Sequence, residues 1–170
     1  KAKIHSENLR RVCSKLTQTE SILIMLSQTR DNIDPFSFET KTRAGGRALK
    51  FYAQVEYWIS VRENLKKSVH GKPRQIGILS QIKVKKTRYT GKVREACVFI
   101  YYSVGVDDIG SCITYLIDEG HWTGTKSQVT APEFKFKGDI AGLIAKIEDS
   151  SMQKDLSALV SEVWDEIEAK

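Results

Sequence analysis

The 170 residues suffice for one compact domain, or for one domain with a small appendage, and exclude two large domains. Hydrophobic residues make up 41% and charged residues 28%, which are ordinary values for a soluble globular chain and exclude a largely disordered one. The longest apolar run, residues 22–26, is far shorter than the roughly 18 residues of a membrane helix, so we expect no membrane partner. Three widely spaced cysteines argue against a disulfide framework and favour a reducing, cytoplasmic location.

The positive charge is unevenly distributed along the chain. Lys and Arg number 27 against 21 Asp and Glu, but residues 147–170 carry seven acids and only two lysines. This pattern favours a polyanionic partner for the basic body and an acidic final segment that competes with it. A solvated surface of mixed charge is the alternative. Because the chain begins at Lys1 and has no apolar leader, we expect a portion of a longer protein.

The first predicted element is an amphipathic helix over residues 3–17. Residues 21–28 are apolar on both faces, as in a central strand that helices cover on each side. The eighteen-residue segment 29–46 is largely polar and shows no period, and a connection of that length is usually functional or disordered.

Three consecutive strands are predicted next. Residues 47–52 can form a helical turn, and residues 53–61 alternate as a half-buried strand does. After a polar, basic connection over residues 63–74, further strands over 76–88 and 95–103 predict an antiparallel meander at the edge of a larger sheet.

Helical patterns dominate the remainder of the chain. Asp107 or Asp108 can cap a helix that runs to Asp118, and a small hairpin over residues 122–136 precedes two further helices. These begin after Asp139 and over residues 156–167, where the apolar spacing is clearest. We therefore expect two domains, residues 1–106 and residues 107–170, the second ending in an acidic helix.

Several kinds of catalytic site are missing from the sequence. The three histidines lie in separate segments without other ligands at metal spacing, so no metal site is predicted. No Gly-x-Ser-x-Gly motif occurs, and Cys97 and Cys112 lie among apolar residues. The phosphate-loop pattern Gly-x-x-x-x-Gly-Lys-Ser/Thr is also absent. We expect no ATP hydrolysis by this chain alone.

The segment 29–46 instead suits binding to a nucleic-acid strand. Arg30, Lys41 and Arg43 can contact phosphates, and two consecutive glycines let backbone N–H groups approach an anion. Ile33 and two phenylalanines can stack on bases. A surface loop with its aromatic side chains packed in the core is the alternative.

At these residues the chain resembles a known family. The segments "SILIMLSQTR" and "AGGRALKFYAQVEYWISV", on either side of the polar loop, and "IKVKKTR" are similar to the RecA-type DNA recombinases. The resemblance is to a divergent bacterial or phage member, and to a C-terminal portion without the phosphate-loop half. It implies an α/β fold: the C-terminal half of a RecA-type ATPase core, with a buried central strand plus antiparallel strands, followed by a small α+β C-terminal domain.

The resemblance also implies roles for particular residues. Gln28 would sense the bound nucleotide, and Lys86 and Arg88 would act in trans on the ATP of the neighbouring subunit. Lys50 and Phe51 would lie at that subunit interface. The residues expected along single-stranded DNA are Ser6, Arg10, Arg30, Ile33, Lys41, Arg43, Gly45, Gly46 and Arg47.

The expected function is part of an ATP-dependent homologous-recombination protein that binds single-stranded DNA, forms a filament and promotes strand exchange. Its cofactors would be ATP and Mg²⁺ in the full-length protein, with none bound by this chain alone. A non-catalytic single-strand-binding accessory module and a filament protein with a merely charged surface are the alternatives. The sequence departs from the family pattern at Ser27, Arg47, Glu56 and Arg88, where Asn, Asn, Arg and Lys are usual.

Overall fold

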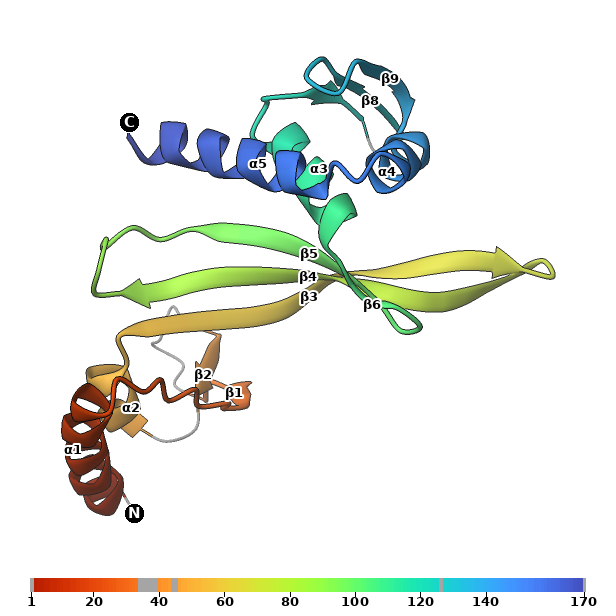
Figure 1. Ribbon diagram of the computed structural model, residues 1–170. Helices are drawn as coiled ribbons and strands as arrows, with labels where there is room; N and C mark the ends of the chain where they lie inside the picture. Colours follow the sequence, from red (N-terminus) through yellow and green to blue (C-terminus); the bar gives the residue numbers. More distant parts are fainter. Residues whose placement is uncertain (1, 34–39, 44–45, 126, 170) are drawn as a thin grey trace. The chain divides into compact units, whose positions relative to one another are not determined.

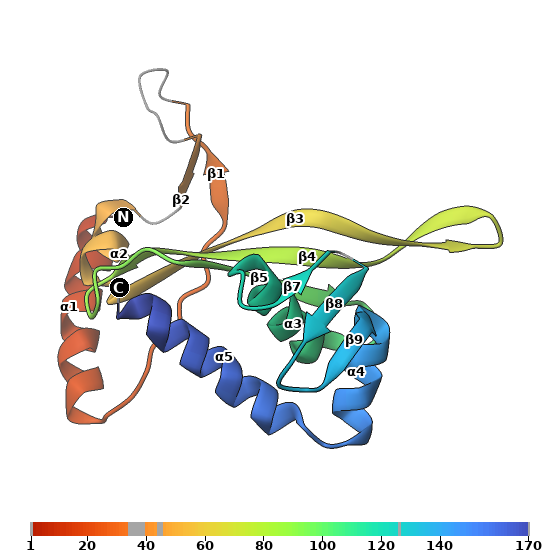
Figure 2. The ribbon, with the colours of Figure 1, turned by 90° about the horizontal axis from the view of Figure 1, so that it is seen from above.

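A computed structural model describes residues 2–33, 40–43, 46–125 and 127–169 of the chain. These residues form two compact units (Figures 1 and 2). The first comprises Lys1–Glu56 and Lys85–Lys92, and the second comprises Tyr57–Val84 and Val93–Lys170. The α/β class and its antiparallel sheets agree with the sequence prediction. The division into two domains at residue 106 stays a prediction.

The first unit is built on two helices and a small hairpin. Helix α1 (Ala2–Gln18) confirms the predicted amphipathic helix and packs against α2 (Gly46–Tyr52), which confirms the predicted helical turn. Strands β1 (Thr29–Asp31) and β2 (Lys41–Arg43) pair antiparallel, with Arg30 opposite Thr42. The polar segment 29–46 is therefore paired at its base, which the sequence did not reveal. Residues 34–39 lie outside the described part of the chain.

The predicted buried strand over residues 21–28 is wrong for this structure. The segment has no regular secondary structure, and Ile22, Ile24 and Leu26 are 89%, 80% and 96% exposed. A strand needs a neighbour for its backbone N–H and C=O groups, and no described strand pairs with this one. The apolar pattern indicates what the segment can bury, but a strand forms only where a pairing partner is present.

The second unit contains a four-stranded antiparallel sheet in the order β3-β4-β5-β6. Its strands are β3 (Val55–Val69), β4 (Lys72–Thr87), β5 (Glu95–Tyr101) and β6 (Gly105–Asp107), and β3 and β4 begin or end in the first unit. The predicted antiparallel meander is confirmed, but among the described residues it forms a sheet of its own and not the edge of a larger one. The predicted connection over residues 63–74 is wrong. Both strands continue to a tight turn at His70 and Gly71, whose φ angles are 52° and 72°.

The buried core of the second unit lies between its three helices and a small sheet. The helices are α3 (Asp108–Asp118), α4 (Ile140–Asp149) and α5 (Gln153–Glu168). The sheet contains β7 (Thr123–Gly124), β8 (Gln128–Ala131) and β9 (Phe136–Asp139), one strand more than the predicted hairpin. The largest core side chains are Trp122, Ile113, Leu116, Leu143, Ile147 and Leu156.

The predicted helix start at Asp107 is confirmed. Its carboxylate accepts a hydrogen bond from the Gly110 N–H at 2.8 Å, which satisfies one of the unpaired donors of the first turn of α3. Asp139 precedes α4 as predicted, but its side chain makes no capping hydrogen bond.

The acidic helix α5 has one acid that is not presented to solvent. Glu168 Oε1 lies 2.5 Å from Arg94 Nε, whereas Glu162, Asp165 and Glu166 are exposed. Asp155, in the first turn of α5, is exposed as well, so four acids of this helix face solvent.

None of the described helices combines the length and apolarity needed to cross a membrane. Within the described residues, no three His, Cys, Asp or Glu side chains come together as metal ligands.

A carboxylate next to the core, Glu133, is expected to make the stability of the second unit depend on pH. Glu133 accepts hydrogen bonds from the Trp122 indole at 2.8 Å and interacts with His121 Nε2 at 2.9 Å. Burial raises the pKa of Glu133, but hydrogen bonds from its own backbone, Trp122 and His121 outweigh burial and hold the pKa below 4.5.

A depressed pKa in the folded state means that this carboxylate stabilises the fold above pH 4.5, and that the contribution is lost as the pH falls through the folded pKa. We expect Glu133→Gln to lose less stability than the unmodified chain between pH 7 and acid pH. Urea unfolding followed by tryptophan fluorescence measures the difference. Equal losses in both proteins would show that Glu133 contributes nothing to the acid sensitivity.

Candidate functional site

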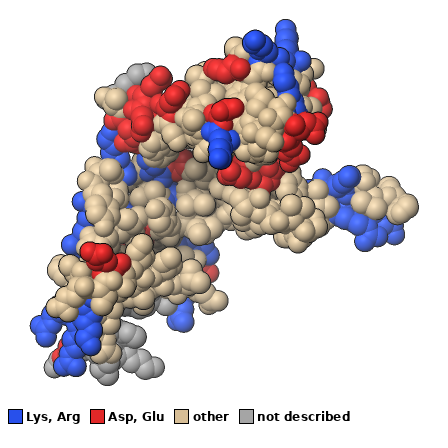
Figure 3. All heavy atoms as spheres, viewed as in Figure 1, with Lys and Arg blue, Asp and Glu red and all other residues tan. Residues whose placement is uncertain are grey.

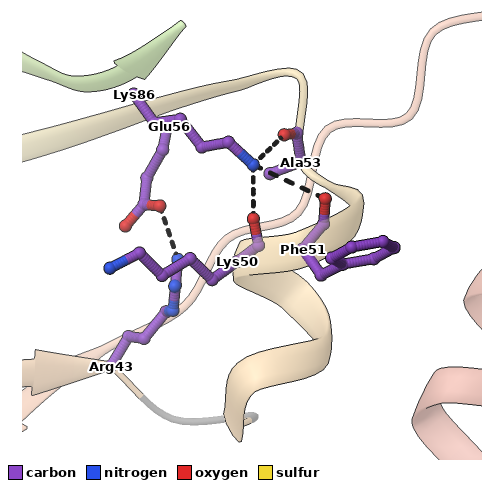
Figure 4. A network of polar contacts seen from close by, with 6 residues as sticks. All are labelled: Arg43, Lys50, Phe51, Ala53, Glu56 and Lys86. Atoms are coloured by element: carbon purple, nitrogen blue, oxygen red, sulfur yellow. Dashed lines mark hydrogen bonds and ion pairs between the residues drawn. The ribbon is translucent and has the colours of Figure 1, made fainter. Parts of the chain in front are cut away.

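The candidate site lies in the first unit, at the C-terminal end of α2 (Figure 4). Lys86, near the end of β4, donates hydrogen bonds from Nζ to the carbonyl oxygens of Lys50, Ala53 and Phe51, the last two at 2.7 and 3.5 Å. The last carbonyls of a helix have no partners within the helix and carry partial negative charge. The cation of Lys86 therefore caps α2.

Arg88 approaches the same end of the helix. Its guanidinium donates a hydrogen bond to the carbonyl oxygen of Phe51 and lies 5.7 Å from the centroid of the Phe51 ring. Because side chains two apart on a strand share a face, Lys86 and Arg88 reach one target, as their spacing predicts. The helix end thus supplies the partial negative charge that lets two cations lie side by side.

Several positive charges lie close together in this cluster. Burial lowers the pKa of Lys86, and the positive charge of Arg88 lowers it further. Arg43 and Lys50 add to the positive potential at Lys86, while Glu56 opposes it. A cluster in which four cations outweigh one carboxylate can bind a phosphate-bearing ligand.

The base of the hairpin is joined to β3 by a half-buried ion pair. Arg43 NH1 lies 2.7 Å from Glu56 Oε2, and the two side chains are only 18% and 14% exposed. Figure 4 shows this pair beside Lys50 and Lys86. The sequence analysis placed Arg43 on phosphates and noted Glu56 only as a departure from a family pattern. Glu56 stands where the resembled family usually has Arg. This departure was the available signal that a cation nearby in the fold, here Arg43, has a carboxylate partner.

The other two cations of the β1–β2 hairpin, Lys41 and Arg30, lie on opposite faces of it. Asp31 opposes Lys41, and their Oδ1 and Nζ atoms lie 2.5 Å apart, with both side chains largely exposed. Arg30 is on the opposite face of β1, exposed and without an ion pair to another described residue. Arg30 is therefore the hairpin cation that a phosphate can reach without displacing a carboxylate.

The remaining predicted residues lie elsewhere in the first unit. Gln28 is exposed in the irregular segment before β1, and Ile33 is 93% exposed. Ser6 and Arg10 are one turn apart on α1. Among the described residues, no hydrogen bond or ion pair joins Gln28, Ser6 or Arg10 to the cluster around α2. Gly46 begins α2, whereas Gly45 and the side chain of Arg47 lie outside the described part.

The sequence of this chain has relatives among known proteins. The family model described as the RecA N-terminal domain matches residues 1–107. Protein RecA of Leifsonia xyli is 32% identical over 117 residues, covering 69% of this chain and 32% of the relative. Protein RecA of Tropheryma whipplei is 31% identical over 119 residues, covering 70% and 26%. The chain thus spans about a quarter to a third of the length of these relatives.

Proposed function

We propose, because this chain belongs to the RecA family of recombination proteins, that it is part of an ATP-dependent homologous-recombination protein. In this proposal the chain binds single-stranded DNA, takes part in a nucleoprotein filament and contributes to strand exchange. A cytoplasmic location belongs to the same proposal. The observation that carries it is the cluster at the end of α2, where the base of the β1–β2 hairpin, α2 and two cations of β4 meet.

The two cations of β4 would act on a nucleotide held by an adjacent subunit. Lys86 and Arg88 are oriented before any ligand arrives, since the carbonyl groups of α2 hold them. Preoriented cations can neutralise the charge that develops on a phosphoryl group during transfer. The phosphate-loop pattern is absent from these 170 residues, so ATP and Mg²⁺ would be bound by other residues, and ATP supplies the transferable phosphoryl group when bound.

Binding of DNA would be coupled to these cations through α2. Strand β2 ends at Arg43, three residues before Gly46, which begins α2. Lys86 and Arg88 contact the last turn of that helix. A single strand of DNA bound along Arg30 and the start of α2 would therefore shift the carbonyl groups that orient Lys86 and Arg88.

Single-strand binding is the part of this proposal that the chain alone can test. We expect affinity for a single-stranded oligonucleotide to fall with salt, because each phosphate contact contributes about −0.7 to the log–log slope. Replacing Arg30 and Arg47 by glutamine is expected to flatten the slope by about 1.4, measured by fluorescence anisotropy in a salt series.

The matched control removes the same charge from the second unit. Lys135 and Lys154 are exposed there, and replacing both by glutamine should leave the slope nearly unchanged. Equal flattening in the two double variants would contradict a specific role for the hairpin and the start of α2.

A further inference from the structure

The hairpin of β3 and β4 extends beyond the rest of its sheet. Strand β5 pairs with β4 only from Gly77 to Lys83, so the segment nearer the turn is a two-stranded ribbon. We define residues 65–76, the ribbon and its turn, as the basic arm. It lies within the second unit, as helix α5 does.

The basic arm carries an unbalanced positive charge on one face. A two-residue turn, in which His70 and Gly71 have positive φ, puts Lys67 directly opposite Arg74. Lys72 shares their face, because residues two apart on a strand point to the same side. The arm contains no Asp or Glu, and these three exposed cations, which we call the cationic face, have no ion pair with another described residue. Like charges opposite each other destabilise an antiparallel pair.

Helix α5 carries the opposite imbalance at its C-terminal end. We call Glu162, Asp165 and Glu166 the acidic end, and all three are exposed without an ion pair to another described residue. The last turn of α5 has no basic residue, although the partial negative charge of a helix C-terminus favours cations there. Figure 3 shows Lys and Arg gathered at the tip of the arm, and Asp and Glu gathered over the C-terminal end of α5.

The two surfaces cannot meet within one chain. Glu168 lies 2.5 Å from Arg94, which adjoins the end of the β4–β5 pairing at Lys83. Nine residues of strand, about 30 Å, separate Lys83 from Arg74. The helix back to Glu162 covers only about 9 Å of that separation, and charges more than about 10 Å apart are screened at 0.1 M salt. Figures 1 and 2 show the arm extending away from the C-terminal end of α5.

Protection against aggregation explains only part of this pattern. Lysine and proline on exposed strands prevent pairing with other chains, and Lys66 and Pro73 fit that purpose. That purpose does not require two cations facing each other on a ribbon of marginal intrinsic stability. Solubility does not require acids at the end of a helix where they are unfavourable. Contact between the cationic face and an acidic end would relieve both kinds of repulsion.

We propose that the basic arm of one chain binds helix α5 of a second copy, with the cationic face against the acidic end. The spacings agree, since Glu162 and Glu166 are one helical turn apart, about 6 Å, and Lys72 and Arg74 are about 7 Å apart on their strand. Because the two surfaces differ, the contact is heterologous and leaves an arm and an acidic end open for further copies. A few exposed ion pairs make it weak and sensitive to salt. It needs neither DNA nor ATP and is independent of the proposed function.

Charge reversal in the full chain tests this contact by sedimentation velocity without DNA or nucleotide. The arm variant carries Lys67→Glu, Lys72→Glu and Arg74→Glu, and the helix variant carries Glu162→Lys, Asp165→Lys and Glu166→Lys. We expect the unmodified chain to sediment faster as its concentration rises at about 0.05 M salt, and to lose this dependence at about 0.5 M salt. Each variant alone should associate at least about tenfold more weakly, because like charges then face each other.

A mixture of the two variants separates a specific contact from an effect of net charge. In the mixture, the negative arm of one variant meets the positive helix of the other, and the two unreversed surfaces also remain complementary. Association should therefore return to that of the unmodified chain. Net charge alone predicts the opposite for the arm variant, because reversing three cations lowers the charge from +6 to 0, which promotes association.

The control variant carries Lys15→Glu, Lys135→Glu and Lys137→Glu, which are also exposed and give the same net charge as the arm variant. Its association should not fall. Circular dichroism checks folding, and glutamine at the same positions provides a second pair of variants without added repulsion. The proposal is overturned by an unmodified chain that stays monomeric at low salt, by unchanged association in both variants, by equal loss in the control, or by no recovery in the mixture. Failure of single-strand binding, measured separately, would count against the proposed function alone.

Discussion

Replacing Lys86 by alanine is expected to abolish DNA-stimulated ATP hydrolysis in a protein that carries this chain together with a phosphate loop. A positioned cation on a transferring phosphoryl group contributes about 10³- to 10⁵-fold to turnover, so its loss leaves little activity. ATP should still bind, because the proposed cation acts on the nucleotide of a neighbouring subunit. Steady-state hydrolysis with single-stranded DNA, together with equilibrium binding of a nucleotide analogue, measures the two effects separately.

A purely structural role for Lys86 predicts a different result. Its Nζ caps α2 through three carbonyl oxygens, and hydrogen bonds to a charged group contribute about 1.5–3 kcal/mol each before exposure to solvent reduces that value. Lys86→Ala would then lower the melting temperature of the first unit, and hydrolysis would recover on cooling. Activity that tracks the folded fraction in this way would contradict the trans role.

Variants of Arg88 test whether the positive charge itself is needed, and Arg88→Lys is the matched control. Arg88→Ala is expected to lose hydrolysis as Lys86→Ala does, whereas Arg88→Lys keeps the cation and restores the residue usual in the resembled family pattern. We therefore expect substantial activity in Arg88→Lys. Near-normal turnover in both alanine variants would remove the proposed role of the pair.

Local signals predicted the helices well because they depend on neighbouring residues. Asp107 precedes an apolar repeat and caps α3 as expected, and the spacing from Leu156 to Ile167 predicts α5. Long-range conditions account for the two main errors. Residues 21–28 have the composition of a buried strand but no pairing partner among the described strands, and the ribbon around His70 lacks apolar alternation because solvent covers both faces.

The sequence predicts the cations of the candidate site. It does not predict their partners, which are the carboxylate of Glu56 and the last carbonyl groups of α2. The resemblance to a recombinase motif predicts a role for Lys86 and Arg88, and their spacing on a strand predicts that they share a face. Nothing local to residue 43 indicates that its guanidinium meets Glu56, because the two residues are on different elements that the fold brings together. The contacts of both cations with the end of α2 required the structure for the same reason.

The ion pair of Arg43 and Glu56 is expected to restrain single-strand binding. A phosphate can engage Arg43 only by displacing a carboxylate at 2.7 Å from a half-buried position. We expect Glu56→Gln to release Arg43, which adds one phosphate contact and steepens the salt slope by about 0.7. Relative to 1 M salt, that contact strengthens binding about fivefold at 0.1 M, and anisotropy titrations of both proteins measure the change.

Asp31→Asn is the control, because it removes the same charge from the other ion pair of the hairpin. That pair is exposed, with Lys41 and Asp31 at 53% and 83%, so water and salt already compete for it, and exposed pairs contribute only about 0–1 kcal/mol. Its removal should change affinity less than Glu56→Gln does. Equal gains in the two variants would reduce the effect to net charge. Weaker binding by Glu56→Gln, in a protein that remains folded, would show instead that Glu56 holds Arg43 in its DNA-binding position.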